Sequence, residues 1–317
     1  MIVFKFYQLF CNYLNNIIFM TINFSTSTAI YQWRPAAWLR IVGTDVHTFL
    51  QGQFSNDLRH LTQASSASVY GLWLTAKGRV LADSFVLRGA SPQEFWIGSY
   101  FSPAASLRER LESHIVADDV ALEDATAEWM GLSILGERAE GILHEGSRPG
   151  VFVFPGRRTR AGGAEAVYRA SAGEPAGITE PPVTELTADD IARLRIAGGI
   201  AAIPTDLGPA DLPHEAGLEV EAVSSSKGCY VGQEVMARLK SVRRRLVRVQ
   251  ARTGPVPGVP APLFSQSRPV GELRSAVGDG AGGWIGLAMV QRLQVSVVSG
   301  LSLAETGAPA LEVLDPP

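Results

Sequence analysis

The sequence predicts a mixed α+β protein that ends in a small all-β domain, which we expect to be a barrel. Two β-prone runs at 69–75 and 80–87 flank the turn AKGR, a pattern typical of a β-hairpin. Apolar residues at helical spacing in 184–200 predict a helix. After Leu246, short apolar runs are broken repeatedly by Gly and Pro, as in small barrels.

The N-terminal half is expected to mix strands with short helices. Residues 37–41 predict a strand, and Thr44 is a candidate N-cap for a helix that ends within FLQGQFSNDL (49–58). Residues 95–97 predict another strand after the hairpin. Ser102-Pro103 has the pattern of an N-cap followed by Pro at the first helical position.

The second half begins with β structure at 128–135 and one strand at 166–170 within a Gly- and Arg-rich loop region. Thr187 and Asp190 have the spacing of a capping box for the helix in 184–200. Residues 204–223 are expected to be irregular. A further short helix is predicted around Val235 and Met236.

The bulk composition is that of an ordinary globular protein. The 317 residues suggest two or three domains, with 46% hydrophobic and 19% charged residues. The net charge of −3 provides no global attraction to nucleic acid or membrane. No apolar run reaches the roughly 18 residues that a membrane span needs, so no membrane association is expected.

The opening segment differs from the rest of the chain. Residues 1–28 contain no Ala, Gly, Pro, Arg, Asp or Glu. Polar residues interrupt their apolar run, unlike a signal peptide. We therefore expect 1–28 to be an extension outside the fold, with Met20 as a candidate start.

The cysteines limit the possible chemistry. There are two, Cys11 and Cys229, and the first lies in the opening extension. A single remaining cysteine excludes an internal disulfide, a CxxC redox pair, a four-cysteine zinc site and a self-contained iron–sulfur cluster. The histidines show no metal-binding spacing, so no metal is expected. A reducing cytoplasm fits this cysteine usage.

Cys229 lies in the stretch KGCYVGQE (227–234). A helix that begins near 231–233 and the charge of Lys227 would both stabilise a thiolate at Cys229. The flanking Gly228 and Gly232 let another molecule approach closely. The alternative is an inert buried thiol, which is common for a free cysteine.

A basic run at 240–248 follows this stretch. It would bind phosphates or the glutamate tail of a cofactor, or it is a solvated linker between domains. In an extended segment, Arg243 and Arg245 share one face, whereas Arg244 and Arg248 share the other. The run lacks interleaved aromatic residues, so direct binding of tRNA is not expected.

Several segments together resemble one family. FLQGQFSNDL (49–58), AKGRVLADSFVLR (76–88), LPHEAGL (212–218) and above all KGCYVGQE (227–234) are similar to motifs of the YgfZ-type folate-binding proteins. These are relatives of the glycine cleavage T protein, an aminomethyltransferase. The resemblance covers about residues 30 to 300, with the motifs in the family's order.

The resemblance implies a GcvT-like fold: a folate-binding module of two interleaved α+β lobes at 29–240, followed by a small β-barrel at 241–317. It implies a tetrahydrofolate-dependent accessory factor for the assembly or repair of iron–sulfur clusters in client enzymes, with indirect effects on tRNA modification. Its partners would be folate and iron–sulfur client or assembly proteins. Whether such a factor is an enzyme is left open.

The resemblance also implies site residues. Cys229 would be the working thiol, supported by the rest of the motif: Lys227, Gly228, Tyr230, Gly232, Gln233 and Glu234. The candidate folate contacts are Arg195, Tyr230, Gln53 and Asn56.

The sequence departs from the aminomethyltransferases at two places. Their hairpin carries an Asp-Asp pair, whereas this chain has Ala82-Asp83. Ala197 stands where related folate binders have a Glu that holds the pterin, and Glu215 or Glu219 is a candidate substitute. The alternative function, a folate-dependent aminomethyl transferase, would depend on Asp83.

Overall fold

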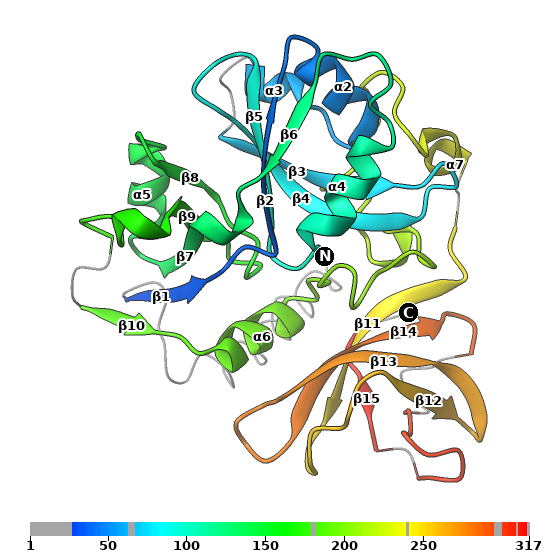
Figure 1. Cartoon of the computed structure of the whole chain (residues 1–317). Helices are drawn as coiled ribbons and strands as arrows, with labels where there is room; N and C mark the ends of the chain where they lie inside the picture. The colour runs from blue at the N-terminus through cyan, green and yellow to red at the C-terminus, as the bar shows by residue number, and fades with distance from the viewer. Residues whose placement is uncertain are drawn as a thin grey trace, which may run out of the picture.

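The computed structural model describes residues 27–62, 67–178, 182–238, 241–294, 300–308 and 310–315. Within these residues the chain forms three five-stranded sheets. Figure 1 shows two of them in the N-terminal module and the third, yellow to red, below it. The predicted extension lies outside the described residues, except that the first strand already begins at Thr28.

The first lobe is built on a sheet of order β3-β4-β5-β2-β6. Helix α4 packs on β2 and β4, and α2 packs on β5. Val46, Phe49 and Leu50 of α2 are buried in the core of this lobe, as their helical spacing requires. The elements are β2 (Ala37–Val42), β3 (Ser68–Leu74), β4 (Val80–Arg88), β5 (Glu94–Ser99), β6 (Ala121–Asp124), α2 (Val46–Gln53), α3 (Arg59–Thr62) and α4 (Ala104–Glu112).

The second lobe has a sheet of order β10-β1-β7-β9-β8, which α5 covers on one side. Its strand β1 precedes the whole first lobe in the chain but pairs with β7 and β10. The two lobes are therefore interleaved, as predicted. The elements are β1 (Thr28–Trp33), β7 (Trp129–Gly136), α5 (Ala139–Glu145), β8 (Val151–Pro155), β9 (Ala164–Arg169) and β10 (Val183–Glu185), with the single turns η1 (Thr126–Glu128) and η2 (Ala170–Ala172).

An aromatic cluster joins the two lobes. Trp38 of the first lobe lies 5.8 Å from Trp129 and 5.5 Å from Phe152 of the second, measured between ring centroids. Tilted and edge-on ring pairs of this kind add to the free energy of simple burial. The cluster thereby fixes the orientation of the lobes that carry the site.

Helix α6 (Ala188–Ala197) lies between the module and the C-terminal sheet (Figure 1). Thr187 and Asp190 form the predicted capping box at its start. The chain then runs irregularly through η3 (Pro213–Glu215) to α7 (Gln233–Arg238), as the sequence indicated.

The C-terminal sheet has the order β12-β13-β14-β11-β15 and curls back on itself. Isolated bridges Phe264↔Ser302 and Leu301↔Leu311 join its β12 edge to the segment that enters β15. Paired in this way, the strands close into a small barrel around an apolar core. The strands are β11 (Arg244–Ala251), β12 (Ala261–Ser265), β13 (Arg268–Gly278), β14 (Trp284–Gln291) and β15 (Glu312–Val313).

Two helix starts differ from the prediction. The N-cap of α2 is Asp45, not Thr44, because Thr44 instead donates its hydroxyl to Asp119, 2.8 Å away. The N-cap of α4 is Pro103, and the Ser102 hydroxyl is used by Asp83. In both cases the hydroxyl forms a hydrogen bond with a residue outside the helix instead of capping the helix.

Candidate functional site

The motif loop at 227–232 is anchored by a buried lysine. The Nζ of Lys227 donates to the carbonyl oxygens of Gln51, Phe54 and Asn56 at 2.7, 2.7 and 2.9 Å. These carbonyls lie at the end of α2 and just beyond it, where helix dipole and free lone pairs favour a cation. All three ammonium hydrogens are used, so Lys227 supports the loop from inside.

Burial lowers the pKa of Lys227 to about 8, against a smaller raising effect of the nearby Asp57 carboxylate. The side chain is only 5% exposed. At neutral pH the ammonium stays charged and its three hydrogen bonds are charge-assisted. Lys227 thus ties the motif loop to α2 and the residues just beyond it through three hydrogen bonds.

Cys229 is exposed on this loop, two residues beyond the anchor. The neighbouring Gly228 is exposed as well, and a Cβ placed on it would meet nothing within 4 Å. The alternative of a buried cysteine is therefore wrong for this chain. Helix α7 begins at Gln233, four residues after the thiol.

The residues after Cys229 fit the loop to the first lobe. The Tyr230 ring is buried among Leu72, Leu74 and Met236, with its centroid 5.2 Å from Lys227 Nζ. Gly232 has a φ of +88°, and a Cβ there would lie 2.7 Å from the carbonyl oxygen of Thr75. This close approach to the β3–β4 turn requires glycine.

Gln233 and Glu234 open α7 and lie toward solvent. Glu234 is exposed and lies 3.9 Å from Arg238, one turn later. An exposed pair of this kind contributes little to stability. Neither side chain approaches the thiol through a hydrogen bond that the structure shows.

A buried carboxyl, Asp83, forms the second part of the site. It lies on β4 and accepts hydrogen bonds from Tyr70 at 2.9 Å, Ser99 at 3.1 Å and Ser102 at 2.7 Å. Burial raises the pKa of Asp83, while the hydroxyl donors lower it. A buried carboxyl whose pKa is raised by burial is a candidate for proton transfer.

Arg157 and Glu221 cover the Tyr70 side of this carboxyl. The Arg157 guanidinium stacks 3.6 Å from the Tyr70 ring centroid and forms an ion pair with Glu221. Asn56 donates to the carbonyl oxygens of both Tyr70 and Glu221. The Asp83 cluster is therefore connected to Asn56, whose own carbonyl accepts from Lys227.

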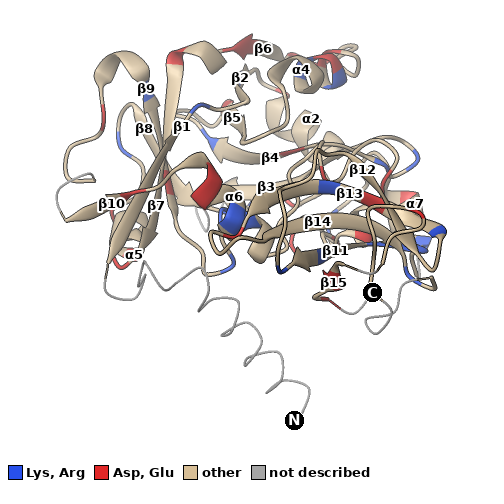
Figure 2. Cartoon of the chain, turned by 90° about the horizontal axis from the view of Figure 1, so that it is seen from below, with Lys and Arg blue, Asp and Glu red and all other residues tan. Residues whose placement is uncertain are grey.

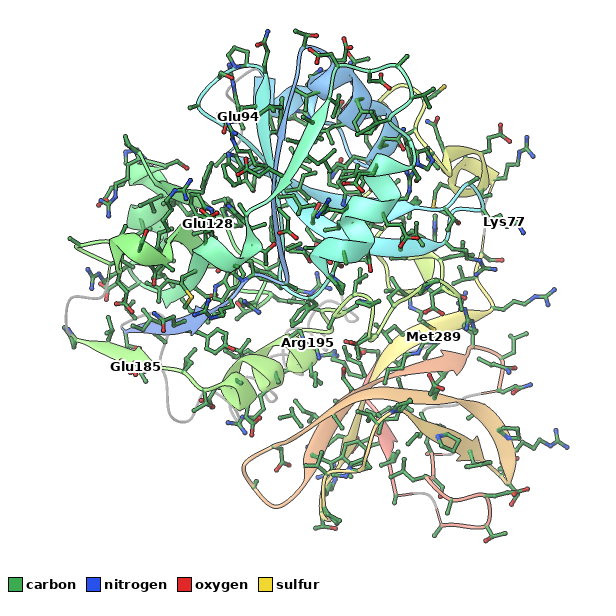
Figure 3. The ribbon with its side chains drawn as sticks, in the orientation of Figure 1. Lys77, Glu94, Glu128, Glu185, Arg195 and Met289 are labelled. Carbon is green, nitrogen blue, oxygen red and sulfur yellow. The ribbon has the colours of Figure 1, made fainter. Side chains whose placement is uncertain are left out.

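The predicted folate contacts lie in different surroundings. Both amide hydrogens of Asn56 are engaged by backbone carbonyls. The buried Arg195 already donates to Asp206 at 2.5 Å, Ile200 and Ser275. Figure 3 places it where α6 meets the barrel. Gln53 has a buried side-chain oxygen that no hydrogen bond satisfies among the described residues.

Ala197, at the position where related folate binders have a Glu, faces the barrel. Ala197 ends α6 and packs beside Val277 and Leu287 of the C-terminal sheet. Of the two candidate substitutes, Glu215 is held by Arg244 at 2.9 Å and by the Leu212 amide. Glu219 keeps one buried oxygen without a hydrogen bond in the described part of the chain. Glu219 therefore keeps more hydrogen-bonding capacity for a ligand than Glu215 does.

Two buried residues of the site were missed from the sequence. Arg158 and Glu165 lie in the second lobe, beside Trp33, Ser133 and Tyr100. The Arg pair after Gly156 and the alternation in β9 were the only local signals. Burial of both side chains depends on strands far away in sequence, which no local pattern shows.

The arginines of the basic run at 240–248 lie on two different faces, as predicted for an extended segment. Arg244 pairs with Asp211 and Glu215, and Arg248 pairs with Asp315. Arg243 and Arg245 are exposed. Figure 2 shows basic and acidic positions interspersed on the barrel strands, so no one-sided basic patch forms along β11.

The same carboxylates join the module to the barrel. Asp211 also accepts from Arg274 of β13 at 2.5 Å, so one buried acid holds arginines from two barrel strands. Such a shared, nearly buried ion pair fixes geometry more than it adds stability. No group of three or more potential metal ligands occurs within the described ranges.

Known proteins with similar sequence or fold agree with this arrangement. The "Iron-sulfur cluster assembly factor IBA57 homolog, mitochondrial" of Aspergillus clavatus is 27% identical over 261 residues, which cover 70% of this chain and 58% of that protein. The chain thus spans less than two thirds of that relative. A model of the GCVT N-terminal domain matches residues 23–150.

The solved structure of the glycine cleavage system aminomethyltransferase T from Bartonella henselae has a TM-score of 0.75. It is 16% identical, and the match covers 95% of this chain and 88% of that one. The chain is thus similar to the GCVT N-terminal domain over part of its length, and it shares its fold with the aminomethyltransferase. The predicted GcvT-like fold is thereby confirmed. Among the described residues, we find no helix with the length and hydropathy that a membrane span requires.

Proposed function

We propose that this YgfZ/GcvT-like protein is a tetrahydrofolate-dependent accessory factor for the assembly or repair of iron–sulfur clusters in client enzymes. The observation that carries the proposal is Cys229, an exposed thiol on a loop held from inside by Lys227. The name of the Aspergillus relative supports the iron–sulfur context. Effects on tRNA modification would be indirect, through a client.

Cys229 is the one cysteine among the residues that the structure describes, which limits what this part of the chain does alone. A cluster needs several thiolate ligands, so Cys229 would supply one ligand or one nucleophile to a complex with a client or assembly protein. The rigid anchor keeps the thiol in a fixed place without covering it. We propose a reducing cytoplasm as the location, because an exposed free cysteine persists there. Cell fractionation tests this.

Tetrahydrofolate binding to the module is supported by buried polar atoms that the fold leaves without a hydrogen bond. Gln53 and Glu219 each keep a buried oxygen without a hydrogen bond in the described chain. Asp83 is a buried carboxyl in the same module. When bound, a reduced folate supplies nitrogens that carry one-carbon units. The residues of this chain would bind it and hold a proton at the Asp83 carboxyl.

The thiol role is tested in a deletion strain. Cys229→Ser should fail to restore the activity of iron–sulfur enzymes, whereas Ser225→Ala, also on an exposed part of this segment, should restore it fully. If Cys229→Ser restores activity as well as wild type does, the thiol has no such role. The folate part is tested by anaerobic calorimetry with tetrahydrofolate. Micromolar binding supports it, and no binding at millimolar ligand removes it.

A second candidate function is aminomethyl transfer to or from folate. Its support is the buried Asp83, whose raised pKa suits an acid in that reaction. Incubation with 5,10-methylenetetrahydrofolate or an aminomethylated carrier protein would then give turnover that Asp83→Ala abolishes. Absence of turnover, or turnover that Asp83→Ala leaves unchanged, rejects this candidate.

A further inference from the structure

Three exposed arginines lie on one face of the barrel, where β11 begins and β14 ends. The amide of Arg292 donates to the carbonyl oxygen of Arg243 at 2.9 Å, in the register that pairs Arg244 with Gln291. Direct partners in an antiparallel pair point to the same face, and so do residues two apart on one strand. Arg245 therefore shares this face with Arg243 and Arg292, and these three exposed residues form the arginine triplet. Along β11 the arginines alternate between faces, so the triplet depends on β14 for its third member.

The arginine triplet has no counter-charge within the described chain. Arg244 and Arg248, on the other face of β11, each form an ion pair with a carboxylate. The triplet forms none with the described residues. The sequence has no Asp or Glu at 235–271 or at 280–304, the stretches that contain β11 and β14. The chain as a whole is acidic, with a net charge of −3, so this local excess of positive charge departs from its average.

The triplet differs from other exposed arginines of the molecule. Arg108 lies 2.9 Å from a carboxylate oxygen of Glu112, and Arg252 lies 3.0 Å from one of Glu312. In the triplet, by contrast, two like charges are direct cross-strand neighbours, an arrangement that destabilises a sheet. An anion from another molecule would remove this repulsion.

The turn after β14 adds an exposed apolar residue beside the triplet. Leu293 follows Arg292 and is fully exposed, in a turn that the Gln294 amide closes on the Gln291 carbonyl at 3.0 Å. Protein interfaces combine such apolar contacts with charged residues around them. Single-stranded nucleic acids instead bind to stacked aromatic side chains, and in the described part of the chain none of the exposed large hydrophobic residues is aromatic. These features favour a protein as the partner.

The strand ends that carry the triplet adjoin the cysteine loop. Leu246, next to Arg245 in the chain, packs in the same apolar cluster as Tyr230 of the motif. Arg79 of the β3–β4 turn and Arg244 both donate to the carbonyl oxygen of Ala210, at 2.8 and 3.0 Å. Figure 1 shows α7, this turn and the start of β11 along one side of the molecule.

We propose that the arginine triplet and Leu293 form a docking surface for a protein partner that presents carboxylates around an apolar side chain. Opposite charges across an interface accelerate association and fix its orientation. Leu293 would supply the apolar contact. A partner held here would lie close to the loop that carries Cys229. That consequence rests on the proposed function, whereas the docking surface itself does not.

Fluorescence anisotropy with a labelled helical peptide rich in Glu and Leu tests the surface. The comparison probes are the same peptide with Lys in place of Glu, and a single-stranded RNA of similar length. Wild type should bind the acidic peptide alone, and about tenfold more weakly at about 0.5 M than at about 0.05 M salt, because salt screens exposed charges. Arg243→Glu/Arg292→Glu should weaken this binding about 10- to 100-fold. Leu293→Ser should weaken it about 3- to 10-fold and leave its salt dependence unchanged.

Arg34→Glu/Arg88→Glu is the matched control, because it makes the same change in net charge at two other exposed arginines. Arg88 lies at the opposite end of β4 from the β3–β4 turn. This variant should bind the acidic peptide within about twofold of wild type, since screening removes the effect of distant charges. Arg243→Gln/Arg292→Gln carries the test if the Glu variant does not fold. It should lose affinity about tenfold or more without loss of stability in urea, because it removes a like-charge pair.

Three results overturn the inference. The first is that wild type does not bind the acidic peptide at low salt. The second is that the triplet variants bind it as tightly as the matched control does. The third is that wild type binds the RNA more tightly than the acidic peptide and loses the RNA in Arg243→Glu/Arg292→Glu, which would make a nucleic acid the partner.

The deletion strain separates this inference from the proposed function. Arg243→Glu/Arg292→Glu should lower the activity of iron–sulfur enzymes several-fold and leave tetrahydrofolate affinity unchanged, whereas the matched control should be fully active. Full activity of the triplet variant overturns the role of the surface in bringing a client to Cys229. If Cys229→Ser is fully active while acidic-peptide binding still requires the triplet, the proposed function fails and the docking surface stands.

Discussion

Replacing Lys227 by Met removes the ammonium that ties the cysteine loop to α2 while keeping a long unbranched side chain. The carbonyls of Gln51, Phe54 and Asn56 would lose this donor. Each unsatisfied buried acceptor costs about 1–3 kcal/mol, and relief of the buried charge offsets part of the loss. We expect a net loss of about 3 kcal/mol in the free energy of unfolding.

The assay is urea unfolding of Lys227→Met beside Lys77→Met. Lys77 is an exposed lysine in the β3–β4 turn, which Figure 3 shows at the outer edge of the molecule. The control should stay within about 0.5 kcal/mol of wild type. Alkylation of Cys229 under native conditions should also become faster in Lys227→Met, because the loop loses its anchor. If both variants unfold at the same urea concentration, the anchoring argument is wrong.

The same lysine gives a pH signature. Its pKa in the folded protein is lowered to about 8 from an ordinary value of 10.5, so the folded state releases this proton before the unfolded state does. The contribution of Lys227 to the free energy of unfolding therefore rises with pH between about 8 and 10.5. This rise should be missing in Lys227→Met and present in Lys77→Met.

Three further predictions concern the surroundings of the site. Burial raises the pKa of Asp83 above its ordinary value of 3.8. The contribution of Asp83 to the free energy of unfolding therefore falls as the pH rises from 3.8 through the raised pKa, and Asp83→Asn should remove this pH dependence in unfolding measurements. Gly232→Ala should cost about 2–4 kcal/mol by thermal unfolding, through its positive φ and the Thr75 contact, whereas Gly228→Ala should be nearly neutral; equal effects would contradict this. Arg274→Met and Asp211→Asn should show about 1–3 kcal/mol of coupling in a double-mutant cycle, and additive effects would contradict a direct pair.

Local patterns predicted the parts of the fold whose partners are near in sequence. The hairpin of β3 and β4 and the capping box of Thr187 and Asp190 were both predicted correctly. The pairing of β1 with β7 was not predicted, because it joins residues about 100 positions apart in the chain. Nothing in the opening strand itself indicates its neighbour in the sheet.

The candidate site was likewise predicted only where local residue patterns indicate it. Residue types in KGCYVGQE indicated a functional loop, but they did not show that Lys227 points inward to carbonyls more than 170 residues earlier. A charged residue beside a cysteine was interpreted as support for the thiolate, whereas the structure uses it to fasten the loop. Arg158 was missed because only the assembled second lobe buries it.

The way the barrel closes has a consequence for the newborn chain. Synthesis runs from the N-terminus, so the module that carries Cys229 has all its residues before the barrel begins. Strand β11 then presents an open edge at Val249 and Gln250 until Glu312 and Val313 emerge to pair with it. An open edge is a template for strands of other chains. A ribosome-bound or prematurely terminated chain would therefore combine a finished thiol loop with an aggregation-prone edge, and chaperones would meet this protein at that stage.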